Sequence, residues 1–469
     1  MKFVIVGGGI SGWLSALIFS HRKPNHEYVI IESSEVNTIG VGEGTTGLFV
    51  ETIEELPDIN VAEFLRETKA TPKIGIEFNN WSGKGSTFFN PIDGTPTTNE
   101  DFDSFLYFTY TQNQSLDTSS LHGLLKRKNK SPYTGRLEDY NSALHLDNKL
   151  TIQYLKNKSL KRKNIKYISD TVSKIKRDET GKVLKIICSN HIIEGDIFID
   201  CTGYSRIFSE KSDWVSFKDN LPMNSVTTFT RKHSVSMVTK ADKLNLGWCW
   251  QIPTQERIGC GYVSCDEWGN NVVDEIKSNY PDAKILKSFK FDSGKLKKSW
   301  NQNVISLGLA YHFLEPLQAT NIHLTLVQID ILCQRCIRET KDRTLNPNII
   351  SIYNNHIDNL IEDFKNFINI HYSRDSRVTL TDYNKKIISL LKVRGLFYED
   401  LPQMYGCSGI GLWGHTLLGL NHITKQECHT FLSEMNLYGE VEEISSELQT
   451  TLTNTPFLSY QELIKSLSI

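Results

Sequence analysis

Hydrophobic residues near the start of the chain form short runs whose spacing changes from one segment to the next. Residues 3–6 are continuously apolar, which is typical of a strand buried on both faces of a parallel sheet. Residues 13–18 carry apolar side chains at helical spacing, and a second apolar run at 28–31 ends at Glu32. This strand–turn–helix–strand order predicts that the chain opens with an α/β domain.

The rest of the chain alternates between strand-like and helical segments, with no internal repeat. Residues 88–131 are rich in aromatic, Asn, Thr and Ser residues, which indicates irregular loop with short elements. Helices are expected from about residue 322 onward. Strands are expected at 166–175, 183–189, 196–201 and 303–307, and a mostly antiparallel sheet at 226–263.

Composition and charge narrow the class of protein. The 469 residues are 39% hydrophobic and 23% charged, which is usual for soluble globular proteins. A net charge of -2 gives no electrostatic reason to expect nucleic acid or an anionic membrane as a partner. No apolar stretch is long enough to cross a bilayer, no signal-peptide pattern follows Met1, and the scattered cysteines do not suggest a disulfide framework. A cytoplasmic location is therefore expected.

A glycine-rich turn directly follows the first predicted strand. Its three glycines fit the G-x-G-x-x-G pattern, and an acidic residue ends the second predicted strand about twenty residues later. In this pattern the glycines permit a tight turn and close approach of a pyrophosphate, and the acidic side chain binds a ribose. Because all parts agree, a bound dinucleotide is favoured over a glycine turn without a ligand. The expected contacts are Gly7, Gly9, Ile10, Ser11, Gly12 and Glu32.

The dinucleotide is expected to be FAD. The chain contains one such fingerprint, whereas enzymes that bind FAD and NAD(P)H in separate units usually show two. Residues 198–204 resemble the strand and turn that close over the flavin in FAD-dependent monooxygenases. We therefore expect an α/β fold with an FAD-binding Rossmann-type domain, similar to that of glutathione reductase and the aromatic hydroxylases.

This domain is expected to be discontinuous, because its α/β segments are separated by other material. It is assigned residues 1–81, 145–215 and 295–335. The intervening residues 82–144 and 216–294 are expected to form an antiparallel-sheet region with loops on the substrate side, and residues 336–469 a mainly helical C-terminal part.

Four further segments carry motifs in a characteristic order. Residues 39–46 read I-G-V-G-E-G-T-T, and residues 73–81 begin with a lysine ahead of an apolar strand. Residues 247–253 contain W-x-W-x-I-P in full, and residues 308–321 contain the F-x-x-P part of an F-x-x-P-x-x-S-x-G region. Together these segments resemble the flavin-dependent halogenases of the tryptophan halogenase type, over most of the first 375 residues.

The resemblance implies an FAD-dependent halogenase that receives reduced FAD from a separate flavin reductase and uses O2 and halide to form hypohalous acid. Lys73 is expected to hold the hypohalous acid, or to form an N-halamine, and to pass the halogen to an electron-rich aromatic substrate. Trp248, Trp250 and Pro253 are expected to shield the flavin from that substrate. Without the resemblance, two tryptophans on one strand face would indicate core, and a lysine beside a strand would be expected to reach solvent.

The resemblance also implies the remaining ligand contacts. The halide is expected at the backbone amides of Thr320 and Asn321, because amides suit an anion without directionality. Further flavin contacts are expected at Gly40, Val41, Gly42, Glu43, Thr45 and Gly308.

Three positions depart from the family pattern. Ala319 stands for the usual serine, Asn321 for a glycine and Gln318 for a glutamate. Asn tolerates left-handed backbone angles better than other non-glycine residues, so the amide geometry is expected to survive. Because the anion pocket is altered and heavier halides are easier to oxidise, bromide or iodide is expected to be favoured over chloride.

Gln318 also changes the expected substrate. In tryptophan halogenases the matching carboxylate meets the indole N–H and is proposed to accept the ring proton. An amide still accepts a hydrogen bond but is a negligible base near neutral pH. Gln318 is therefore kept as a catalytic-site residue, and the substrate is expected to be an activated ring rather than free tryptophan.

Two other functions stay open at this point. One is an FAD-dependent aromatic monooxygenase, which Lys73 and the two tryptophans disfavour. The other is a catalytically inactive FAD-binding protein, suggested by the changes at residues 318–321. Cys333 and Cys336 are expected to be buried structural thiols, and no metal site is expected, because no second ligand pair accompanies them. The sequence is compatible with a homo-oligomer.

Overall fold

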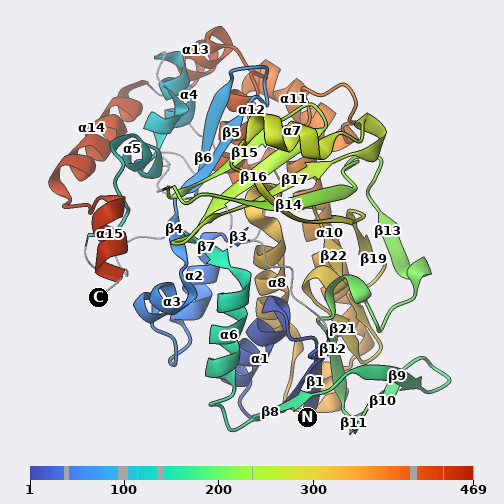
Figure 1. The fold of residues 1–469 in the computed structure, drawn as a ribbon. Helices are drawn as coiled ribbons and strands as arrows, with labels where there is room; N and C mark the ends of the chain where they lie inside the picture. Colours follow the sequence, from blue (N-terminus) through green and yellow to red (C-terminus); the bar gives the residue numbers. More distant parts are fainter. Residues whose placement is uncertain are drawn as a thin grey trace.

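Two large sheets, one above the other in Figure 1, form the body of the computed structural model, and helices pack around them. The structure describes residues 1–35, 42–92, 104–112, 115–134, 142–234, 236–401, 409–436 and 438–467. Gly40 and Val41, two of the predicted flavin contacts, lie outside these described residues.

The six-stranded sheet has the first strand of the chain near its centre. Phe3 and Ile5 pack into the same core as the helix that follows them, whereas Val4 faces a second core on the other side of the sheet. All neighbouring strands are parallel except the edge pair β20–β21, so the predicted α/β opening is confirmed. In sheet order, the strands are β20 (Trp300–Asn301), β21 (Val304–Ser306), β12 (Ile197–Asp200), β1 (Lys2–Val6), β2 (Glu27–Glu32) and β8 (Ile165–Ser169).

One predicted strand is two strands in different sheets. The segment 166–175 was expected to be continuous, but β8 ends at Ser169 and β9 begins at Val172. Between them, the Asp170 carboxylate accepts hydrogen bonds from the backbone amides of Thr171 at 2.8 Å and Asn190 at 3.0 Å. These bonds bend the chain away from the parallel sheet. The second strand joins the small sheet of β9 (Val172–Arg177), β10 (Val183–Cys188) and β11 (Ile192–Glu194).

The seven-stranded sheet is antiparallel except for the pair β15–β5, which confirms the sheet expected at 226–263. In sheet order, its strands are β18 (Lys284–Lys290), β14 (Ser225–Arg231), β17 (Ile258–Ser264), β16 (Gly247–Pro253), β15 (Val238–Lys243), β5 (Gly75–Asn79) and β6 (Thr87–Pro91). A separate three-stranded sheet consists of β13 (Trp214–Ser216), β19 (Gly294–Leu296) and β22 (His312–Phe313).

The position of β5 differs from the expected division of the chain. Residues 1–81 were assigned to the cofactor-binding segment, but β5 pairs with β15 and β6 in the seven-stranded sheet. Pairing with β15 requires the register Val238↔Gly75, between residues far apart in the sequence. No local pattern reveals a partner at that distance.

A three-stranded sheet connects the two large sheets. Its central strand β7 (Ala143–Asp147) pairs on one side with β3 (Gly42–Gly44) and on the other with β4 (Thr71–Lys73). His145 is the register partner of both Gly44 and Thr71. Two segments that are almost thirty residues apart in the sequence are therefore held one strand apart.

Helices surround the sheets and make up most of the chain from Thr320 onward, close to the expected start near residue 322. The described part of the segment 88–131, where irregular loop with short elements was expected, contains short helices. The helices are α1 (Ile10–Arg22), α2 (Gly47–Glu54), α3 (Val61–Thr68), α4 (Ser104–Thr111), α5 (Leu121–Lys128), α6 (Asn148–Ser159), α7 (Val272–Asn279), α8 (Thr320–Ile331), α9 (Lys341–Thr344), α10 (Pro347–His371), α11 (Asp382–Arg394), α12 (Gly409–Gly419), α13 (Lys425–Glu434), α14 (Tyr438–Asn454) and α15 (Tyr460–Leu467).

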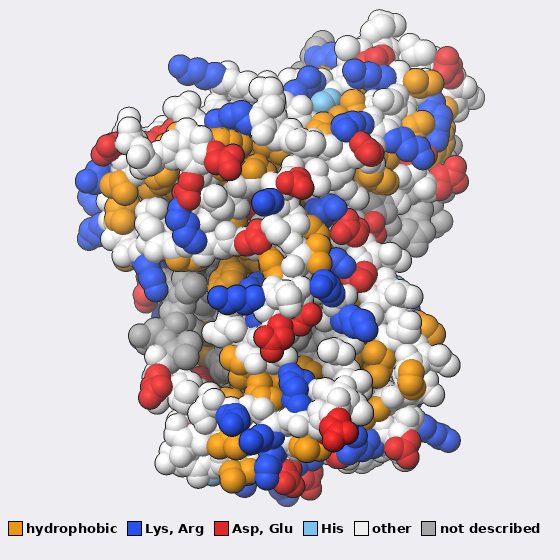
Figure 2. Space-filling view, turned by 90° about the vertical axis from the view of Figure 1, so that its right-hand side faces the viewer, with side chains coloured by type: hydrophobic (Ala, Val, Ile, Leu, Met, Phe, Trp, Pro, Cys, Tyr) orange, Lys and Arg blue, Asp and Glu red, His pale blue; other side chains and the backbone are white. Residues whose placement is uncertain are grey.

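Charges of both signs are mixed on the face shown in Figure 2, where basic and acidic side chains alternate without a continuous region of one sign. This distribution agrees with the net charge of -2. Within the described ranges, no helix combines the length and apolar character that a membrane span requires.

Candidate active site

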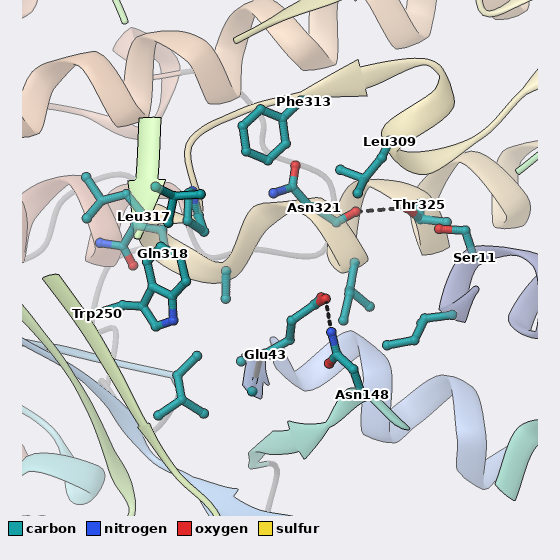
Figure 3. A pocket seen from close by; sticks show the side chains of 18 of the residues that line it. Ser11, Glu43, Asn148, Trp250, Leu309, Phe313, Leu317, Gln318, Asn321 and Thr325 are labelled. Atoms are coloured by element: carbon teal, nitrogen blue, oxygen red, sulfur yellow. Dashed lines mark hydrogen bonds between the residues drawn. The ribbon is translucent and has the colours of Figure 1, made fainter. Parts of the chain in front are cut away.

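A continuous cavity of about 280 Å³ lies between the two large sheets. One side is formed by a face of the seven-stranded sheet, and the other by the turn before α1, strand β3 and the start of α8. In Figure 3, Ser11 and Asn148 mark one end of this cavity, and Gln318 and Trp250 mark the other. The predicted site residues that line it are Gly9, Ile10, Ser11, Gly42, Glu43, Lys73, Trp248, Trp250, Gln318 and Asn321.

The glycine turn has the geometry of a phosphate cradle. A Cβ atom on Gly12 would lie 1.9 Å from the carbonyl oxygen of Gly7, and one on Gly7, at φ 117°, would lie 2.2 Å from that of Cys201. Both positions therefore require glycine. A Cβ on Gly9 would meet nothing within 4 Å, so the space beside it is free for a ligand. Gly9 caps α1 without a side-chain hydrogen bond, which leaves first-turn amides available for a pyrophosphate.

Glu32 lies beside this turn, where a ribose contact was predicted. A Cβ on Gly8 would lie 2.3 Å from its carboxylate oxygen. The carboxylate already pairs with Lys156 Nζ at 2.5 Å and accepts a hydrogen bond from the Tyr167 hydroxyl at 3.1 Å. Glu32 does not line the cavity described above, so its contact with a ribose stays a prediction.

Lys73 is the last residue of β4, and its side chain is completely buried. Its Nζ donates a hydrogen bond to the carbonyl oxygen of Thr45 at 2.8 Å. A Cβ atom on Gly44 would lie 3.2 Å from this Nζ and 3.4 Å from the Cβ of Ala319. The amine therefore lies between the β3 segment and the residues that precede α8, and it faces the cavity.

A half-buried carboxyl group belongs to the β3 segment. Glu43 accepts a hydrogen bond from Asn148 Nδ2 at 2.5 Å, and both residues line the cavity (Figure 3). Burial raises the pKa of Glu43, and the bond from Asn148 partly opposes that rise. Asn148 is the first residue of α6, directly after the register pair Gly42↔Asp147. No sequence motif indicated Asn148, because only the β3–β7 pairing brings it here.

The two tryptophans of β16 both line the cavity, and their ring centroids are 6.0 Å apart. The ring of Trp250 crosses the neighbouring strand at Gly261, where a Cβ atom would lie 2.1 Å from it. Trp248 donates from Nε1 to Glu315 at 3.4 Å, and Glu315 also accepts a hydrogen bond from the Tyr372 hydroxyl. Glu315 is completely buried, and burial raises its pKa to about 7, although both donors act to lower it.

The residues before α8 have left-handed backbone conformations. Gln318 has φ 69° and Ala319 has φ 58°, and Ala319 caps the helix without a side-chain hydrogen bond. The sequence argument had assigned the need for left-handed angles to Asn321, which was wrong, because Asn321 lies in the first turn of α8. Its side chain instead accepts from the amide of Leu314 at 3.3 Å and donates to the carbonyl of Leu314 at 3.1 Å.

Several predicted contacts surround the cavity without lining it. Gly308, at φ 56°, leaves room for Ser11, since a Cβ there would lie 2.4 Å from Ser11 Oγ. The carbonyl oxygen of Pro253 accepts a hydrogen bond from Thr71 Oγ1 at 2.7 Å. The predicted contacts that do not line the cavity are Gly7, Gly12, Glu32, Thr45, Pro253, Gly308 and Thr320.

Buried histidines near the cavity were not singled out from the sequence as site residues. His371 Nε2 lies 3.0 Å from Gln318 Nε2. His145 joins Thr71 at 3.2 Å to Thr239 at 2.8 Å, and burial together with the Lys73 charge lowers its pKa well below the usual value. Their partners lie 53, 74 and 94 positions away in the chain, so no local pattern could indicate them.

Cys333 and Cys336 are buried free thiols, as expected, and burial raises the pKa of each. They lie in the π-helical turn Leu332–Cys336 that follows α8. In the part of the chain that the structure describes, no three His, Cys, Asp or Glu side chains are grouped so as to hold a metal ion.

Comparison with known families assigns the chain to a class. A family model described as tryptophan halogenase matches residues 2–398. The chain belongs to this family. It is therefore an enzyme of the flavin-dependent halogenase class, and FAD is the cofactor that this class implies. The glycine turn, with its open space at Gly9 and its free amides, fits that cofactor.

Individual relatives of this halogenase are distant. Tryptophan 7-halogenase RebH of Lentzea aerocolonigenes is 24% identical over 407 residues, 79% of this chain and 76% of the relative. Tryptophan 6-halogenase ThaL of Streptomyces albogriseolus is 25% identical, covering 80% and 76%. Among solved structures, Xcc4156, a flavin-dependent halogenase from Xanthomonas campestris, superposes with a TM-score of 0.85 at 23% identity, covering 99% and 98% of the two chains. That likeness confirms the expected fold class.

The open space at Gly9 allows cofactor binding to be separated from folding. Gly9→Ala adds a methyl group that meets no protein atom within 4 Å, at a residue with φ -79°. The halogenase should keep its thermal stability, but its FAD affinity should fall about 10-fold or more, because the pyrophosphate can no longer approach the backbone. Fluorescence titration with FAD measures this. Gly47→Ala, where α2 begins, is the matched control, and equal FAD affinity of both variants would contradict the assignment of the turn.

The raised pKa of Glu315 predicts a pH-dependent stability. The folded pKa is about 7 against an ordinary 4.5, so the carboxyl group stabilises the fold below pH 4.5, and this contribution is lost as the pH rises through 7. Glu315→Gln cannot titrate but can still accept from Tyr372 and Trp248. Relative to the wild type, the variant should gain about 3 kcal/mol of unfolding free energy between pH 4.5 and 7.5, as measured by chemical denaturation. Glu256→Gln, at an exposed site, is the control, and parallel pH profiles for wild type and Glu315→Gln would refute the prediction.

Proposed function

We propose that this halogenase forms hypohalous acid from halide and O2 with reduced FAD, and that Lys73 delivers the halogen to an electron-rich aromatic ring. The observation that supports the proposal is the position of the Lys73 amine. It is completely buried, yet it faces the same cavity as the glycine turn. An oxidised halogen species formed at a flavin bound in this cavity can therefore reach the amine without passing through bulk water.

Reduced FAD, when bound, supplies the reducing equivalents with which O2 oxidises the halide. The chain binds its pyrophosphate through the turn at Gly9 and the first amides of α1. Because the chain carries a single dinucleotide fingerprint, reduced FAD comes from a separate flavin reductase. We assign no second nucleotide site to this chain.

The halide binds at the start of α8, at the amides of Thr320 and Asn321. Unpaired first-turn amides and the positive end of the helix dipole attract an anion there. Ala319 provides no side-chain cap that would compete for these amides. The buried Thr320 Oγ1 has no hydrogen-bond partner among the described residues, so a donor is left for a ligand.

Trp248 and Trp250 separate the cofactor from the organic substrate. Their rings occupy the cavity wall beside Lys73, and Glu315 holds the Trp248 indole through its Nε1. A small hypohalous acid molecule can pass where an aromatic ring cannot. Direct oxygen transfer to the substrate, the reaction of a monooxygenase, is prevented by this separation.

Lys73 holds hypohalous acid through its ammonium donors, or its neutral amine takes the halogen from hypohalous acid with release of water and passes it to the ring in exchange for the ring proton. The carbonyl oxygen of Thr45 holds the amine in place at 2.8 Å. Water excluded from this position cannot compete for the oxidant. Gln318 faces the substrate end of the cavity and is not a base. We therefore propose activated rings such as phenols or substituted indoles as substrates, and not free tryptophan. The names of the relatives specify tryptophan for those proteins.

Replacing the amine separates halide oxidation from ring halogenation. Lys73→Ala should bind FAD and form trappable hypohalous acid as the wild type does, while halogenation of an activated ring falls about 100-fold or more. A hypohalous-acid-trapping dione and product chromatography measure the two steps. Lys240→Ala, on the neighbouring sheet and half exposed, is the control. Unchanged product yield in Lys73→Ala would remove the amine from the reaction, and an oxygenated product from the wild type would favour a monooxygenase.

Halide competition tests the anion site. With equal chloride and bromide, the brominated product should predominate, and iodide should be accepted, because the site lacks the family's serine and glycine at residues 319 and 321 and heavier halides are oxidised more easily. Mass spectrometry of the products gives the ratio. A clear excess of chlorinated product would contradict this preference. Absence of any halogenated product, with FAD still bound, would indicate an inactive flavoprotein.

A further inference from the structure

The hydrogen bonds around His371 determine which of its ring nitrogens carries the proton. Its Nδ1 lies 2.8 Å from the carbonyl oxygen of Phe367, one turn earlier in α10. A carbonyl oxygen only accepts, so Nδ1 is protonated and donates. Burial lowers the pKa of His371 to about 4, so the ring is neutral near pH 7 and Nε2 carries a lone pair.

This tautomer determines the orientation of the Gln318 side chain. The amide atom 3.0 Å from His371 Nε2 has to be a donor, which is the amide nitrogen and not the oxygen. The carbonyl oxygen of Gln318 is left on the opposite side. Figure 3 shows this oxygen on the cavity side of the amide, with the nitrogen turned away.

The imidazole is itself held rigidly. His371 is completely buried, and its ring packs against Phe78, Phe367 and Trp81 at centroid distances of 5.1, 5.2 and 6.0 Å. Aromatic neighbours offer no alternative acceptor for Nδ1 and no counter-ion that would stabilise an imidazolium. The ring therefore stays neutral and keeps one orientation. The backbone of Gln318 is itself in the left-handed region, at φ 69°.

We propose that His371 is a positioning residue that holds the Gln318 carbonyl oxygen toward the cavity, and that the enzyme thereby selects neutral aromatic rings that carry an N–H or O–H donor. This inference rests on the proposed function. A carbonyl oxygen offers a lone pair but no negative charge. The site therefore favours a ring that carries a hydrogen-bond donor, and this donor need not be cationic or strongly acidic. The donor is the group that a methylated analogue lacks.

Matched substrates measure this selectivity. Indole and 1-methylindole are both electron-rich and differ in the N–H; 2-naphthol and its methyl ether provide a second pair. For each enzyme, kcat/KM of the donor ring is divided by that of its methylated analogue. Comparing this ratio between wild type and variant cancels the intrinsic reactivity of the rings.

Two substitutions at His371 separate its hydrogen bond from its shape. His371→Phe keeps a flat ring among aromatic neighbours but removes the acceptor, so the substrate ratio should fall about 10-fold. His371→Gln restores an oxygen acceptor and should recover part of the ratio. His415→Phe is the control: this residue is equally buried and bonded through Nδ1 to a helix carbonyl at 2.8 Å, but its Nε2 contacts Ser119. It should leave the ratio unchanged.

A spectroscopic measurement tests the tautomer without turnover. In protein with ¹⁵N-labelled histidine, His371 should show a protonated Nδ1 and an unprotonated Nε2 from pH 6 to 8, assigned by its loss in His371→Phe. A protonated Nε2, or a substrate ratio unaffected by His371→Phe, overturns the inference. If the wild type halogenates no ring at all, the proposed function fails, while the nitrogen spectrum still decides the orientation of Gln318.

Discussion

One buried hydrogen bond, from Lys73 Nζ to the carbonyl oxygen of Thr45, connects the parts of this site. Lys73 ends β4 and Thr45 follows β3. These two strands lie near each other because each of them pairs with β7. A flexible lysine in a completely buried position needs such an acceptor, since an unpaired ammonium group away from water is costly. The bond consequently places the amine toward the cavity and attaches it to the segment expected beside the flavin.

Burial disfavours the charged forms of several polar groups around the cavity. Glu315 has a pKa raised to about 7, and the pKa of His371 is lowered to about 4. Burial also acts on Glu43 and His145 in the same sense. Apart from the amine, the surroundings of the cavity therefore contain few permanent charges. A neutral oxidant such as hypohalous acid suits these surroundings better than an ion would.

Differences from the family pattern are concentrated where α8 begins. Gln318 and Ala319 both adopt left-handed conformations, and Asn321 binds the backbone of Leu314 through its side chain. A glycine at residue 321 could not make those two bonds. The chain thus keeps the helix start that suits an anion, while the group beside it is a neutral amide held by a neutral imidazole. The proposed sites for substrate recognition and halide binding are thus adjacent in the fold but rest on different atoms.

Features that depend on neighbouring residues could be predicted from the amino-acid sequence. The period of apolar positions indicated the first strands and helix. The glycine spacing indicated the turn, because Gly12 is required by its close contact with the backbone of Gly7 in the same turn. The halogenase motifs likewise each lie within one short segment.

Contacts between residues far apart in the sequence became known only from the folded structure. It placed β5 in the seven-stranded sheet, brought Asn148 to Glu43, assigned left-handed angles to Gln318 and Ala319, and set His371 against Gln318. Such contacts depend on strand register and on the depth of burial, which are collective properties of the folded chain. A local pattern of residue types carries information about neither.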